Sequence, residues 1–119
     1  MAKFNIHAGH CPDGKGASGA VGILKESTEA RKVKNKVIVL LKKEGHTAYD
    51  CTCDEKTTQS GCLTKIVKKC NAHTVKRDVS IHLNSGRDDL KGDGKTGGVE
   101  VYILSLIHIS EPTRLRRSR

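Results

Sequence analysis

The sequence predicts an α/β fold with a twisted, mostly parallel sheet flanked by helices. Two observations predict it. Short apolar runs alternate with helix-like segments in the order β-α-β-α-β-loop-β, and the two longer segments carry apolar residues at three-and-four spacing. The 119 residues suffice for one domain, and its core must be aliphatic because Trp is absent, Phe occurs once and Tyr twice.

The first half of the chain predicts a strand, a helix and a second strand. Residues 3–8 are a short apolar run, and the turn-forming residues 11–19 follow it. Residues 28–44 predict the best helix, and most of its lysines and its arginine fall outside the apolar stripe. That stripe consists of Ala30, Val33, Val37, Leu40 and Leu41. Gly45 follows as a C-terminal cap, and residues 46–51 predict the second strand.

The second half predicts a helix and two further strands. Residues 59–73 form the helix, with Leu63, Ile66, Val67 and Cys70 on one face. Residues 78–83 predict the third strand and residues 99–103 the fourth. Between them, residues 85–98 contain five glycines and predict a loop.

The chain is basic, with a net charge of +9 and a pI near 9.5. This charge favours an anionic partner, namely nucleic acid, an anionic polymer or a membrane surface, although a solvated lysine-rich helix face would also explain it. No segment is apolar enough to insert into a membrane. The first residues lack the apolar core of a signal peptide, so we expect synthesis in the cytoplasm and, if the protein is exported, another route.

The five cysteines show no recognised metal-binding spacing. Cys51 and Cys53 are separated by one residue, which is too tight for the usual pair of zinc ligands. Their number is odd, so free thiols are expected, with Cys70 in the core.

Two histidines and a glutamate stand where metal ligands would be expected. His10 and His82 lie at the carboxyl ends of predicted strands, where open α/β sheets bind ligands, and Glu26 opens the first helix. Two imidazoles and one carboxylate make a three-ligand zinc site with a fourth position for water, the arrangement of hydrolytic zinc. His7 and Glu29 are alternatives to two of these ligands, and acidic residues also favour a helix start through the dipole alone.

At these residues the chain resembles the catalytic domain of zinc-dependent N-acetylmuramoyl-L-alanine amidases of bacterial autolysins and phage endolysins. The resemblance covers residues 3–103 and rests on Gly9-His10, the run SIHLN at 80–84, the run GGVEVY at 97–102 and the run ESTEARKV at 26–33, which is most similar to clostridial members. It implies zinc held by His10, Glu26 and His82, with Glu26 favoured over Glu29 by its distance from Gly45. It also implies hydrolysis of the amide between N-acetylmuramic acid and L-alanine in peptidoglycan, at the cell wall, with Asn84 as a candidate substrate-binding residue.

Residues 104–119 match nothing in an amidase and resemble translated sequencing-adapter sequence. Members of the family continue with further helices and strands, so the resemblance implies a sheet that is truncated on its C-terminal side. We therefore expect residues 1–103 to be the N-terminal part of the amidase domain and residues 104–119 a non-native tail, which supplies +3 of the charge. No residue matches the family's general acid/base glutamate, since Glu100 belongs to the predicted fourth strand and Glu111 to the tail. Its loss costs a factor of about 10²–10⁴, so we expect this chain to be poorly stable and inactive on its own.

Two other functions fit parts of the sequence. A zinc-binding α/β domain without catalysis needs only the three ligands. A basic nucleic-acid-binding module would explain the charge, but aromatic stacking residues are almost absent and no common recognition motif occurs. Zinc stoichiometry and wall hydrolysis separate these hypotheses from the amidase.

Overall fold

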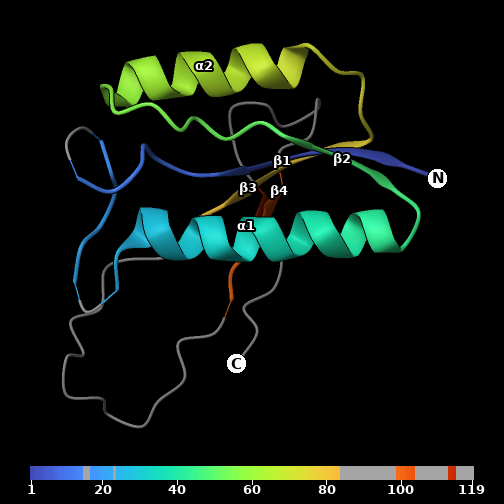
Figure 1. Ribbon diagram of the computed structural model, residues 1–119, viewed down its shortest axis with the longest axis horizontal. Helices are drawn as coiled ribbons and strands as arrows, with labels where there is room; N and C mark the ends of the chain where they lie inside the picture. Colours follow the sequence, from blue (N-terminus) through green and yellow to red (C-terminus); the bar gives the residue numbers. More distant parts are fainter. Residues whose placement is uncertain (15–16, 23, 84–98, 104–112, 115–119) are drawn as a thin grey trace, which may run out of the picture. The chain divides into compact units, whose positions relative to one another are not determined.

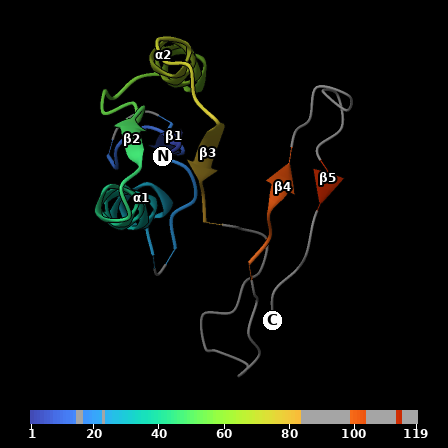
Figure 2. The same ribbon diagram turned by 90° about the vertical axis from the view of Figure 1, so that its right-hand side faces the viewer.

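A computed structural model describes residues 1–14, 17–22, 24–83, 99–103 and 113–114, and the chain forms two compact units, Met1–Gly86 and Arg87–Arg119. In the first unit, three parallel strands pair in the order β2-β1-β3. The strands are β1 (Lys3–Ala8), β2 (Thr47–Asp50) and β3 (Arg77–Ile81). Two helices, α1 (Glu26–Lys43) and α2 (Gln59–Asn71), lie on opposite faces of this sheet (Figure 1, Figure 2). The predicted α/β class with parallel strands is confirmed.

The register brings the carboxyl ends of β1 and β3 to the same level. Ala8 is the partner of Ile81 in the parallel ladder, and the Gly9 N–H donates to the Ile81 carbonyl at 2.9 Å. His82 directly follows Ile81, and His10 follows Ala8 by two residues, so both histidines lie just beyond these strand ends. This edge of the sheet is where the sequence predicted the site.

Helix α1 begins two residues earlier than predicted, and its buried face differs from the predicted stripe. Val33 is 47% exposed and Leu40 is 58% exposed, whereas Ala30 and Lys34 are buried. Lys34 can occupy this face because its aliphatic stem packs there while its ammonium reaches the Asp50 carboxylate, 2.7 Å away at the end of β2. The predicted placement of the lysines away from the packed face is thus wrong for this residue.

The predicted end of α1 is confirmed. Gly45 adopts a left-handed backbone with φ of 85°. Its N–H donates to the Lys42 carbonyl and the His46 N–H donates to the Leu41 carbonyl, which is the Schellman arrangement. The chain then enters β2 directly.

Helix α2 begins with a capping bond, since the Thr58 side chain accepts from the Gly61 N–H. Ile66 is buried as predicted, together with Cys62. Leu63 and Val67 were predicted on the same face but are 54% and 53% exposed. The reason is that the helix turns Cys62 inward to join two other thiols in a small core cluster, which consists of Cys11, Cys53, Cys62 and Ile66.

In the second unit, β4 (Tyr102–Ile103) pairs antiparallel with β5 (Thr113–Arg114). The predicted fourth strand is therefore present over two of its five residues, and its partner is a segment for which the sequence predicted no strand. The predicted loop 85–98 and Asn84 lie outside the described residues. None of the helices in the described part of the chain is long and apolar enough to cross a membrane.

Candidate metal centre

The two predicted histidine ligands face each other across the end of the sheet. The ring centroids of His10 and His82 are 5.0 Å apart, and the rings are nearly perpendicular at 89°. His10 has a left-handed backbone with φ of 64°, which is uncommon for a residue with a side chain. This conformation turns the chain away from the strand direction just after β1, where the imidazole meets that of His82.

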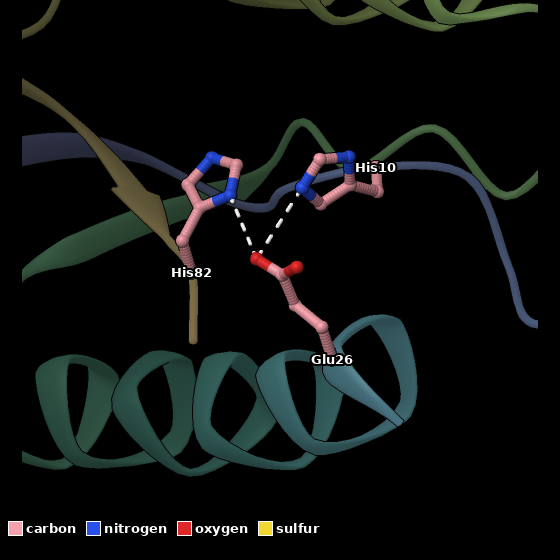
Figure 3. Close-up of side chains that lie close together, drawn as sticks. All are labelled: His10, Glu26 and His82. Carbon is pink, nitrogen blue, oxygen red and sulfur yellow. Dashed lines mark hydrogen bonds and ion pairs between the residues drawn. The ribbon is translucent and has the colours of Figure 1, made fainter. Parts of the chain in front are cut away.

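Glu26 brings its carboxylate to both imidazoles from the first turn of α1 (Figure 3). Its Oε1 lies 3.3 Å from His10 Nε2 and 3.2 Å from His82 Nδ1. Its other oxygen, Oε2, accepts a hydrogen bond from the Ala20 N–H at 2.9 Å. One carboxylate oxygen is thus held by the backbone, and the other converges with two ring nitrogens.

The environment of Glu26 keeps it ionised. Burial raises the pKa of its carboxyl group, but the Ala20 N–H and the neighbouring His10 and His82 outweigh burial, and the pKa is lowered from its ordinary value. A carboxylate must be deprotonated to bind a metal, and Glu26 meets this condition at neutral pH.

Two glycines make room for the three side chains. A Cβ on Gly9 would lie 2.0 Å from His82 Cε1, well inside contact distance. A Cβ on Gly19 would lie 2.7 Å from both Glu26 Oε2 and His10 Cδ2, and Gly19 also has a left-handed φ of 80°. The imidazole and the carboxylate therefore occupy space that any other residue at these positions would fill.

Arg31 ties together the segments that carry the site. Its Nη2 donates to the His10 carbonyl at 3.2 Å and to the Cys53 carbonyl at 2.6 Å. Its Nη1 donates to the Ser27 carbonyl at 3.1 Å, and its Nε pairs with Asp54 at 3.2 Å. One guanidinium thus connects the turn after β1, the start of α1 and the segment after β2.

The structure separates the predicted ligands from their alternatives. His10, Glu26 and His82 offer donor atoms that all lie within 4.8 Å of one another. His7 lies within β1 and is not in this group, and Glu29 pairs with Lys32 at 2.9 Å instead.

All five cysteines are free, as predicted, and none of them belongs to this group. Burial raises the pKa of the Cys62 thiol, and it raises that of Cys70 to about 12. Both groups therefore remain protonated at neutral pH and pack as small apolar side chains.

Three supporting residues, Gly19, Ala20 and Arg31, were not identified from the sequence. They act through contacts that depend on how the turn after β1 folds back onto α1, and the sequence pattern does not reveal these contacts. Gly9 was noted in the Gly-His pair, but nothing in the sequence indicates that its lack of a side chain makes room for His82.

The donor set fits zinc. Two imidazoles and one carboxylate are the protein ligands of a catalytic zinc site, in which a fourth position stays open. Bonds of about 2.0–2.1 Å in a tetrahedron place neighbouring donor atoms roughly 3.3 Å apart. The two nitrogen-to-oxygen distances of 3.3 and 3.2 Å agree with this spacing.

A family model described as N-acetylmuramoyl-L-alanine amidase matches residues 5–118. This range includes all but the first two residues of the three-stranded sheet, both helices and the three clustered side chains. It also extends beyond Ile103, where the resemblance by motif ends, and the assignment of residues 104–119 to a separate tail stays a prediction. No curated protein matches the chain.

Proposed function

Because the chain belongs to the N-acetylmuramoyl-L-alanine amidase family, we propose that its clustered side chains form a zinc centre for hydrolysis of peptidoglycan. The bond cleaved is the amide between N-acetylmuramic acid and L-alanine. The observation that carries the proposal is the convergence of Glu26 Oε1 with His10 Nε2 and His82 Nδ1. The proposed zinc ligands are these three residues.

Hydrogen bonds from surrounding residues fix the orientation of the proposed ligands. The Ala20 N–H holds one oxygen of Glu26, so that the other is directed at the imidazoles. Arg31 anchors the backbone of the turn that carries His10. The side chain of His82 is 48% exposed, which leaves this side of the centre accessible to a large substrate.

When bound, zinc would polarise the amide carbonyl and lower the pKa of a coordinated water, so that hydroxide is available near neutral pH. The protein's own contribution is to supply a single negative charge from Glu26 and two neutral nitrogens in a partly buried setting. This low net charge at the ligands preserves the electrophilic character of the metal.

The proposed place of action is the cell wall. The basic charge supports this, because +6 of the net +9 lies outside residues 104–119 and a basic enzyme is attracted to a wall that contains anionic polymers. Lysines exposed on α1 contribute to this charge, among them Lys32, Lys36, Lys42 and Lys43.

Among the described residues, the clustered group contains one carboxylate, Glu26, and no second glutamate beside it. The general acid/base of the reaction is therefore unassigned. This observation favours, as a second candidate, a zinc-binding domain without catalysis, and the 119-residue chain is expected to be inactive on its own.

The proposal is tested by zinc stoichiometry together with the chemistry of wall cleavage. We expect about one zinc per chain after dialysis, lost in His82→Ala. His73→Ala is the matched control, because His73 stacks on Tyr49 and is outside the group. Zinc retained equally by both variants would contradict the assigned ligands.

Long incubation of the zinc-loaded chain with purified peptidoglycan tests the reaction itself. An amidase exposes new α-amino groups on L-alanine, whereas a glycosidase exposes new reducing sugar ends. Zinc-dependent release of L-alanine amino groups supports the amidase. Zinc binding with no release supports the non-catalytic candidate.

A further inference from the structure

A cavity adjoins the proposed metal centre on the side of α2. Its volume is about 100 Å³, and both imidazoles, of His10 and His82, form part of its wall. Leu63 and Ile66 of α2 form an apolar wall. Glu26 does not line it, since the carboxylate reaches the imidazoles from α1, which lies on the opposite face of the sheet (Figure 1, Figure 3).

The floor of the cavity is polar and comes from the sheet. His7 and Ser80 are register partners on β1 and β3, and both line the cavity. Gln59, the first residue of α2, adds a side-chain amide. The cavity thus combines one apolar wall with groups that can exchange hydrogen bonds with a peptide, which is typical of small-ligand sites.

We propose that this cavity is the subsite for the L-alanyl residue of the muramoyl peptide, with the alanine methyl group against Leu63 and Ile66. The inference rests on the proposed function, and it adds which side of the scissile amide is bound here. A volume of about 100 Å³ suits a methyl group with its neighbouring peptide atoms. The N-acetylmuramoyl ring is larger and carries hydroxyl and acetamido groups that an apolar wall would leave without hydrogen-bond partners.

The position of the cavity fits this occupant. Because the two imidazoles are shared between the cavity and the proposed metal centre, an alanine held in the cavity has its amide nitrogen next to the metal position. The sugar side of the amide then points out of the cavity, where the half-exposed His82 leaves space.

The test compares two ligands that differ by one methyl group, N-acetylmuramoyl-L-alanine and N-acetylmuramoyl-glycine. Their binding to the full chain is measured by NMR titration, with and without zinc, and initial rates replace the titration if the ligand is cleaved. Burial of one methyl group predicts about fourfold tighter binding of the alanine ligand.

Leu63→Asn and Val67→Thr form a matched pair of variants. Both replace an apolar side chain on α2 by a polar one of similar size, and the two positions are 54% and 53% exposed, but only Leu63 lines the cavity. We expect Leu63→Asn to reduce the preference to less than about twofold and Val67→Thr to keep it. Ser80→Leu, which fills the cavity from the floor, should weaken the alanine ligand more than the glycine ligand.

Three results would overturn the proposed alanine subsite. The unmodified chain could bind the alanine and glycine ligands equally well, or bind neither of them. Alternatively, Leu63→Asn and Val67→Thr could show the same preference for the alanine ligand. Each of these leaves the metal centre standing if zinc is retained. If the unmodified chain does not retain zinc but still prefers the alanine ligand to the glycine ligand, the proposed function is contradicted and the subsite is supported.

Discussion

Gly9→Ala changes the candidate metal centre by a single methyl group. The added Cβ would lie 2.0 Å from Cε1, 2.4 Å from Nδ1 and 2.5 Å from Nε2 of His82. Carbon contacts are normally about 3.5–4.0 Å, so the ring must withdraw by roughly 1.5 Å. Metal–ligand distances in functional sites hold to within about 0.2 Å. The variant should therefore lose His82 as a properly placed ligand.

The expected size of the effect follows from what smaller disturbances cost. Removing a group that only orients a metal ligand weakens metal binding about 10–100-fold. Displacing the ligand itself should cost at least this much, which corresponds to about 1.4–2.7 kcal/mol of zinc binding free energy. The Gly9 N–H can keep its bond to the Ile81 carbonyl, so the sheet should persist.

Zinc affinity measured by competition with a chromophoric chelator tests this expectation. Gly22→Ala is the control, since a Cβ at Gly22 meets no atom within 4 Å. Circular dichroism and thermal unfolding of the zinc-free proteins report whether both variants fold. If Gly9→Ala is folded and binds zinc within about threefold of Gly22→Ala, the proposed role of His82 is refuted.

Three further predictions concern the residues around the centre. Glu26→Ala should abolish zinc retention measured by elemental analysis, whereas Glu29→Ala removes only an exposed pair and should leave it unchanged; the reverse result would exchange the two residues. Arg31→Met should weaken zinc binding about tenfold in chelator competition, and Arg31→Lys should restore little of it, because one ammonium cannot also replace the separate Nη1 and Nε bonds to Ser27 and Asp54. Burial raises the pKa of the Asp50 carboxyl, but the bonds from Lys34 and Thr52 outweigh burial, and the pKa lies below its ordinary 3.8. The ionised Asp50 therefore stabilises the fold fully above pH 3.8, and this contribution is lost as the pH falls through the lowered pKa. Solvent screens this pair, because the Asp50 side chain is 44% exposed. Asp50→Asn should therefore lower the free energy of unfolding in urea by about 1 kcal/mol at pH 7 and by progressively less below pH 3.8. An equal loss at pH 7 and pH 3 would contradict the role of the ion pair with Lys34.

The sequence by itself determined the order of elements and the edge of the sheet at which chemistry should occur. Alternation of short apolar runs with amphipathic segments depends on local periodicity, which a single sequence displays. His10 and His82 were predicted at the carboxyl ends of two strands, and in a parallel sheet these ends share one edge. Glu26 was predicted at a helix start, and α1 does begin there.

The tertiary structure alone decided which side chains meet. Local periodicity could not distinguish Lys34 from Val33 on α1, because the choice depends on Asp50 at the end of a different element. Nor could it select Cys62 rather than Leu63 as the buried residue of α2, since burial there follows the positions of thiols from two distant loops. Hydrophobic burial has no direction, so helix rotation is set by whichever partners the rest of the chain brings near.

The candidate centre illustrates the same division. Residue types and their order favoured two histidines and a glutamate, but atoms 16 and 56 residues away from Glu26 along the chain had to come within 3.3 Å of its carboxylate. That convergence depends on the space left by Gly9 and Gly19. It also depends on the hydrogen bonds that the Ala20 N–H donates to Glu26 and the Arg31 guanidinium donates to the His10 carbonyl. Each of these is a short-range contact between segments distant in sequence, so only the folded chain specifies it.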